Sequence, residues 1–182
     1  MFIQTESTPN PATLKFLPGQ AVMTSGTANF SDAAEAGRSP MAVALFAVDG
    51  VAGVFLGSDF VTVTKLADKD WDIIKPQILG AIMEHYQSGQ PVISDAEAGP
   101  DSDAPSDEIS LQIKELIDTR VRPAVAQDGG DIVFKGFEGG VVYLHMQGAC
   151  AGCPSSTATL KHGIENMLRY YVPEVNEVRA VE

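Results

Sequence analysis

The residues of this sequence most suited to chemistry are two cysteines, Cys150 and Cys153, which are three positions apart and are its only cysteines. They lie in the run Gly148-Ala149-Cys150-Ala151-Gly152-Cys153-Pro154-Ser155-Ser156. A CxxC pair offers two thiolates to one soft metal centre, whereas tetrahedral zinc and the common iron–sulfur clusters take about four protein ligands. One chain therefore brings half of these ligands, and two chains that meet at a two-fold axis would bring all of them.

The elements on either side of the cysteines are predicted to be a strand and a helix. Apolar and polar residues alternate over 142–146, which is the period of a half-buried strand. Pro154 suits a first helical turn. Apolar residues then recur at helical spacing, namely Leu160, Ile164, Met167, Leu168 and Tyr171. Because a helix N-terminus stabilises thiolates, we expect a lowered pKa for both cysteines. Gly148 and Gly152 carry no side chains, which lets the backbone fold tightly around a bound group.

Histidines are the other candidate ligands or bases. His145 lies on the polar face of the predicted strand, and His162 lies nine positions after Cys153, more than two helical turns away. We therefore expect both to be ordinary surface or packed histidines rather than metal ligands. His85 falls on a largely apolar face of another predicted helix, where we expect a satisfied core group rather than a base.

Composition narrows the class of protein and its partners. The chain has 182 residues, 45% of them hydrophobic, which allows one or two modest domains that each bury a core. The net charge of −12 argues against nucleic acid and against an anionic membrane surface as partners. The sequence contains no run of about 18 apolar residues, so it predicts no membrane-spanning helix. The first residues carry neither a basic nor an Arg-rich leader, so we expect a cytoplasmic protein or a processed one, in a reducing compartment.

Residues 1–93 are predicted to form a small α+β domain. The patterns predict strands over 2–5 and 12–17 and a hairpin of 51–56 and 60–65. They also predict a helix that begins at Ser39-Pro40 and ends at Gly50. A second helix is predicted to begin at Asp70, with Pro76 either near its first turn or kinking it. Trp71 and Phe60 are expected in the core. No constellation of catalytic residues stands out in this part of the sequence.

An acidic segment, residues 94–108, separates this domain from the next. It carries six acidic residues and no Lys or Arg, which is half of the net charge. With Ala, Ser, Gly and Pro as its other residues, it predicts a flexible linker.

Residues 109–182 are predicted to form a second α+β domain of order α-β-β-α-β. Its first helix, over 109–125, has an apolar stripe of Ile109, Ile113, Leu116, Ile117, Val121, Ala124 and Val125, with Arg120 and Arg122 among its exposed residues and Pro123 interrupting it. The turn that follows, Asp128-Gly129-Gly130-Asp131, must accept unusual backbone angles, and it leads into a strand over 132–137. A last strand, over 172–181, is expected to be antiparallel or at an edge.

Two stretches resemble one protein family. The run from Arg122 to Ser156, with Asp128-Gly129-Gly130-Asp131 and the cysteine turn through Pro154, resembles the NifU C-terminal domain of the Nfu family of iron–sulfur cluster carriers. Residues 3–16 resemble the N-terminal domain of the mitochondrial and related bacterial members. The resemblance implies a protein that is not an enzyme, from the bacterial cytoplasm or the mitochondrial matrix.

The same resemblance implies a cargo and partners. A 4Fe-4S cluster would be bridged between the two subunits of a homodimer by Cys150 and Cys153 of each. An upstream cluster-assembly scaffold would supply the cluster, and apo iron–sulfur enzymes such as aconitase or lipoyl synthase would receive it.

Two other functions fit a CxxC turn. A thiol-disulfide oxidoreductase also places such a pair at a helix N-terminus, although here Ala151-Gly152 lacks the typical proline and no βαβ unit precedes it. A zinc ion bridging a structural dimer would use the same four thiolates.

Overall fold

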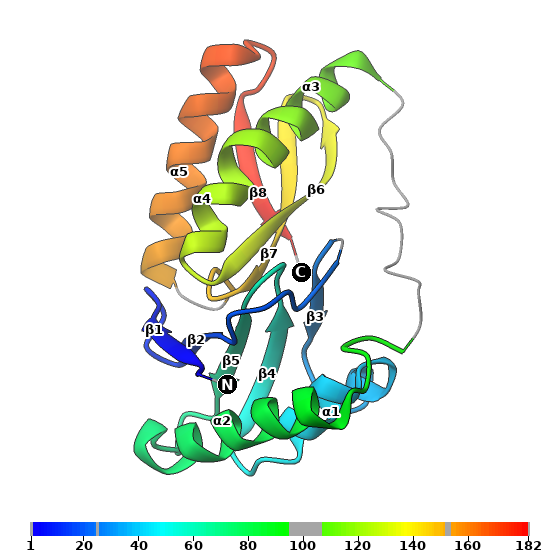
Figure 1. Cartoon of the computed structure of the whole chain (residues 1–182). Coiled ribbons are helices and arrows are strands. Elements are labelled where there is room, and N and C mark those ends of the chain that lie inside the picture. Colours follow the sequence, from blue (N-terminus) through cyan, green and yellow to red (C-terminus); the bar gives the residue numbers. More distant parts are fainter. Residues whose placement is uncertain (1, 25, 95–106, 152–153, 182) are drawn as a thin grey trace. The chain divides into compact units, whose positions relative to one another are not determined.

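The computed structural model describes residues 2–24, 26–94, 107–151 and 154–181 (Figure 1). The chain divides into two compact units, Met1–Ala98 and Gly99–Glu182, which we describe separately. Both units combine helices with β-strands, so the predicted α+β class is confirmed. None of the described helices is both long enough and apolar enough to cross a membrane.

The first unit contains an antiparallel sheet of five strands in the order β1-β2-β5-β4-β3. The strands are β1 (Gln4–Ser7), β2 (Thr13–Leu17), β3 (Ala28–Phe30), β4 (Val51–Leu56) and β5 (Val61–Lys65). The predicted hairpin of β4 and β5 is confirmed, and β1 begins two residues after its predicted start at residue 2. The sequence did not predict β3, because three residues are too few to show an alternating pattern.

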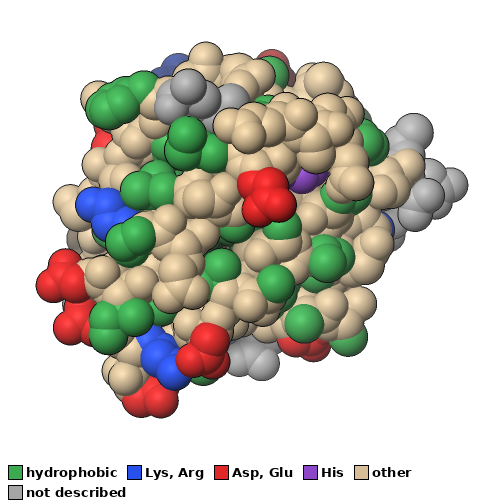
Figure 2. Space-filling view, turned by 60° about the horizontal axis from the view of Figure 1, so that its bottom comes forward, with side chains coloured by type: hydrophobic (Ala, Val, Ile, Leu, Met, Phe, Trp, Pro, Cys, Tyr) green, Lys and Arg blue, Asp and Glu red, His purple; other side chains and the backbone are tan. Residues whose placement is uncertain are grey.

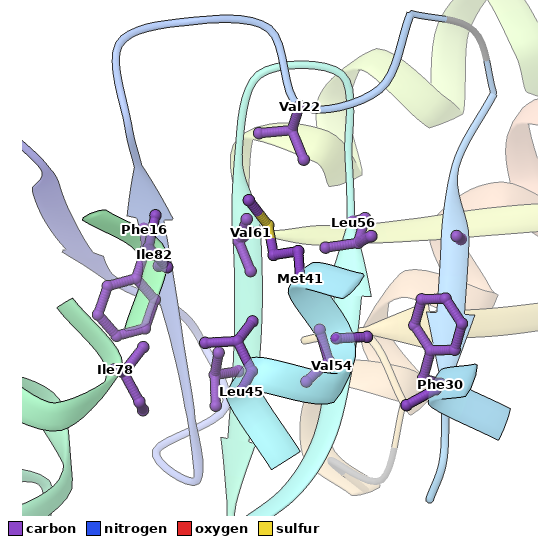
Figure 3. Close-up of a cluster of buried hydrophobic side chains, with 14 of the residues drawn as sticks. Phe16, Val22, Phe30, Met41, Leu45, Val54, Leu56, Val61, Ile78 and Ile82 are labelled. Carbon is purple, nitrogen blue, oxygen red and sulfur yellow. The ribbon is translucent and has the colours of Figure 1, made fainter. Parts of the chain in front are cut away.

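The capping residues at the starts of both α-helices of the first unit act as predicted, but the first helix ends at Phe46, four residues before the predicted stop at Gly50. The Ser39 side chain accepts a hydrogen bond from the Ala42 amide and caps α1 (Pro40–Phe46). Asp70 likewise caps α2 (Trp71–Ser88), which runs through Pro76, and a short 3-10 helix, η1 (Glu35–Arg38), precedes α1. Figure 3 shows how the helices supply the core: Ile78 and Ile82 of α2 lie beside Phe16 of β2, and Leu45 of α1 points toward the sheet.

The outer surface of these helices has isolated exposed apolar side chains. Val43 of α1 and Ile73 of α2 are exposed. Figure 2, a view turned so that α1 and α2 come forward, shows hydrophobic side chains scattered between backbone and polar atoms. Apolar residues distributed in this way are normal for a protein surface and do not by themselves mark a binding site.

His85 corrects one expectation for the first unit. Its side chain is 5% exposed on the core side of α2, but Nε2 has no hydrogen-bond partner among the described residues. Burial lowers the pKa of His85, because the charged imidazolium would lose its hydration. The group is therefore buried as predicted, but its Nε2 lacks the expected partner among the described residues.

The second unit contains a three-stranded sheet in the order β6-β7-β8. Its elements are α3 (Glu108–Leu116), a π-helical turn η2 (Ile117–Val121), α4 (Arg122–Gln127), β6 (Gly130–Glu138), β7 (Val141–Gly148), α5 (Pro154–Tyr171) and β8 (Glu177–Val181). The strand β8 lies at an edge, as expected, but it begins at Glu177 rather than at residue 172, and it pairs with β7 in parallel rather than antiparallel. The reason is α5, which carries the chain back along the sheet so that β8 starts from the same end as β7.

The first helix of this unit differs from its predicted form. Pro123 does not end the helical path, because a π turn precedes it and the Arg122 amide donates to the Ile117 carbonyl. Proline lacks an N–H and lies in the first turn of α4, where that group is not needed. Ala124 is exposed rather than part of the apolar stripe, and Arg122 is only partly exposed.

The ends of the acidic segment are tied to the unit on each side. The Ser39 hydroxyl donates to the Val92 carbonyl at 2.6 Å, and the Ser94 amide donates to the Arg38 carbonyl at 2.9 Å. Asp107 caps α3 by accepting from the Ser110 amide at 2.9 Å. The helix thus begins at Glu108, one residue before the predicted start, and residues 95–106 lie outside the described residues.

Candidate functional site

Cys150 lies on the predicted turn between β7 and α5. The strand ends at Gly148, which has a φ of 62°, and the Ala151 amide donates back to the Gly148 carbonyl at 3.1 Å. The helix α5 then begins at Pro154. Cys150 is 7% exposed and belongs to the hydrophobic core of the unit. Cys153 and Gly152 lie outside the described residues, so the pairing of the two thiols stays a prediction.

The Asp128-Gly129-Gly130-Asp131 turn is packed against Cys150. The Ala149 amide donates to the Gly129 carbonyl at 3.2 Å, and Gly130 pairs with Gly148 across the sheet. A Cβ on Gly130 would lie 2.5 Å from the Cys150 Sγ, so no larger residue fits there without a shift. Gly129 has a φ of 78°, the left-handed conformation that glycine adopts most readily. The turn that the sequence offered as a support for the cysteines therefore packs directly against Cys150, and its role in the site stays a prediction.

An ion pair that the sequence analysis missed holds this turn. Arg122 donates to Asp131 through Nε and Nη2, each at 2.8 Å, and the Asp131 side chain is 5% exposed. The same guanidinium donates to Asp118 at 3.2 Å. The Arg122 side chain was expected to face solvent. The i, i+4 spacing of Asp118 and Arg122 was a signal in the sequence for their contact, but it does not indicate the pair with Asp131.

The pKa of Cys150 contradicts the expectation for a thiol near a helix N-terminus. Burial, with smaller contributions from the negative charges of Asp128 and Asp131, raises the pKa of Cys150 to about 12. Cys150 is buried and precedes the first residue of α5 by four positions, so loss of hydration outweighs the dipole of the helix. The lowered pKa predicted for Cys150 is therefore wrong.

The two histidines of this unit are placed as ordinary residues. The His145 Nδ1 lies 3.1 Å from the Val181 carbonyl oxygen, and His162 is exposed on α5. Among the residues that the structure describes, no group of three or more His, Cys, Asp or Glu side chains is arranged to hold a metal ion.

Comparisons with known proteins place both units. A family model described as "Scaffold protein Nfu/NifU N terminal" matches residues 3–89, and a "NifU-like domain" matches residues 113–179. The human "NFU1 iron-sulfur cluster scaffold homolog, mitochondrial" is 50% identical over 100% of this chain and 72% of its own length. The chain belongs to the Nfu family.

Other members of the Nfu family are equally similar. A protein of the same name from Drosophila sechellia is 52% identical over 100% of this chain, and "NifU-like protein 4, mitochondrial" from Arabidopsis thaliana is 54% identical over 98% of it. The chain spans 65% of the length of each of these two relatives. The family predicted from the two motifs is thus confirmed, and the NifU-like match includes both cysteines.

Proposed function

We propose that this chain carries an iron–sulfur cluster on Cys150 and Cys153 and transfers it to apo-proteins. The observation that supports this most is that its only cysteines form a CxxC turn inside the segment that matches the NifU-like domain. The names of the relatives point the same way, since they describe iron–sulfur cluster scaffolds rather than enzymes. The cluster is the cargo of such a protein.

The ligand count supports a shared cluster. A 4Fe-4S cluster is commonly held by four cysteine thiolates, and each chain supplies two cysteines. A homodimer with the two CxxC turns facing each other would complete the set. Because each subunit contributes half of the ligands, thiols of a client protein could replace one subunit's pair at a time.

The burial of Cys150 bears on how cargo is bound. A metal ligand must be a thiolate, so binding must remove the proton from a thiol whose pKa burial has raised. The metal supplies the attraction that makes this favourable. The raised pKa also lowers the thiolate fraction of Cys150, which counts against Cys150 as the attacking thiol of an oxidoreductase.

Partners and location follow from the family. An upstream assembly scaffold would donate the cluster, and apo iron–sulfur enzymes such as aconitase or lipoyl synthase would accept it. The relatives are named mitochondrial, which favours the mitochondrial matrix over the cytoplasm that the sequence alone suggested. We retain the domain bounds of 1–93 and 109–182 with the linker at 94–108 as part of this proposal.

Anaerobic reconstitution with ferrous iron and sulfide tests the proposal. We expect about two iron per chain in a dimer, and Cys150→Ala and Cys153→Ala variants that stay folded and bind no cluster. A monomer that retains a full cluster, or a variant that does, would contradict the shared site. Colourless protein with about half a zinc per chain and no affinity for iron would favour the zinc-bridged dimer instead.

A further inference from the structure

A chain of ion pairs runs from α3 to the cysteine turn. Lys114 donates to Asp118 at 3.0 Å, Asp118 accepts from Arg122 at 3.2 Å, and Arg122 forms its two 2.8 Å bonds to Asp131. Asp131 also accepts from the Ile132 amide at 2.8 Å. These contacts join residues of α3, the π turn and α4 to the first residues of β6.

Asp131 is the last residue of this series of ion pairs and lies next to the cysteine turn. It follows Gly130, where an added Cβ would lie 2.5 Å from the Cys150 Sγ, and it is paired across the sheet with Gln147. Its carboxylate is buried, so it needs a charged partner in a fixed geometry. A guanidinium that donates two parallel hydrogen bonds provides both, which a lysine ammonium does not.

The π turn sets where Arg122 stands. Proline has no amide hydrogen, so in a regular helix the carbonyl four residues before Pro123 would lose its hydrogen bond. The wider i to i−5 turn at Ile117–Val121 changes the direction in which the following side chains point. Arg122 then faces both Asp118 in the π turn and Asp131 on β6. The backbone irregularity and the ion pair thus act at the same residue.

We propose that Asp131 is a positioning residue for Cys150, and that Arg122, braced by Asp118 and Lys114, holds it in place. The path runs from the clamped Asp131 carboxylate to the Gly130 backbone, and from there to the Cys150 side chain that Gly130 contacts. The proposal rests on the proposed function, because it concerns how well the position of the Cys150 side chain is fixed for binding the cluster. Mutating residues that orient a metal ligand without binding the metal themselves commonly changes metal affinity by about 10- to 100-fold.

The experiment compares two site variants with two controls in the full chain. Asp131→Asn removes the charge with little change in size, and Arg122→Lys keeps the charge but cannot form the paired bonds. Arg179→Gln removes an exposed ion pair, with Glu177, in the same unit. Val178→Ala destabilises the core at the far end of the sheet, where Val178 pairs with Val142 rather than with the cysteine end of β7.

Each protein is measured at the same interval below its own unfolding midpoint, so that loss of stability alone cannot separate them. After reconstitution, a chelator is added and loss of the cluster absorption is followed. We expect Asp131→Asn and Arg122→Lys to lose the cluster about 10- to 100-fold faster than wild type, and both controls to match wild type. In the apo-proteins, deuterium exchange over 128–132 and 147–151 should quicken in the two site variants only.

Equal loss rates and equal exchange in Asp131→Asn and Val178→Ala would overturn the positioning role, since both would then act through stability alone. Wild-type behaviour of Arg122→Lys would overturn the requirement for the paired bonds. If wild type takes up no cluster, the proposed function fails, whereas exchange in the apo-proteins still decides whether Asp131 positions the cysteine turn.

Discussion

Replacing Gly130 by alanine should disturb the cysteine turn more than any comparable change on β6. The added Cβ would lie 2.5 Å from the Cys150 Sγ, 2.9 Å from the Gln147 carbonyl oxygen and 3.0 Å from the Cys150 amide nitrogen. Non-bonded heavy atoms prefer separations of about 3.5 to 4.0 Å, so the Sγ contact is about 1 Å too short. The thiol can rotate away, but the other two atoms belong to the backbone and can only move with the strand.

The cost of such overpacking is about 1 to 3 kcal/mol of the free energy of unfolding. For a domain of this size each kcal/mol lowers the midpoint of thermal unfolding by about 4 to 8 °C. The change should be confined to the second unit. Cluster binding should also weaken, because relief of the contact moves the Cys150 Sγ away from its present position.

The assay follows the two units separately. Trp71, the only tryptophan, lies in α2, so its fluorescence reports unfolding of the first unit, and circular dichroism reports both units. Gly136→Ala is the matched control, because it lies on the same strand and its Cβ would have no heavy atom within 4 Å. If Gly130→Ala and Gly136→Ala show the same unfolding midpoints and the same cluster retention, the steric reasoning is refuted.

Two further changes test other parts of the structure. Gly163→Ala in α5, where a Cβ meets nothing within 4 Å, should stabilise the second unit by about 0.8 to 1 kcal/mol because alanine favours helix; an unchanged midpoint in urea would count against a regular helix at this position. His85, whose folded pKa is lowered by burial, should leave the first unit fully stable above its unfolded pKa of about 6.5 and weaken it as the pH falls toward the folded value. His85→Leu should remove that dependence, measured as the urea midpoint of Trp71 fluorescence between about pH 5 and 8, and a variant with the wild-type pH profile would show that another group is responsible.

The sequence by itself determined the elements whose signals are local. Alternation before Gly148 and the proline at 154 predicted the strand, the turn and the helix around Cys150, and all three are present. Ser39 and Asp70 predicted the starts of α1 and α2 in the same way. These signals suffice because a cap or an alternating face depends on residues that are adjacent in the chain.

Tertiary structure alone decided what surrounds each charged or polar group. Arg122 looked like a surface residue on an amphipathic helix, yet it meets a carboxylate on β6 because the glycine turn folds the strand back against α4. Cys150 was expected to have a lowered pKa and has a raised one, and His85 was expected to have a partner, but its Nε2 has none among the described residues. The physical reason is that desolvation and partners depend on which distant segments pack together, and periodicity within one segment carries no record of them.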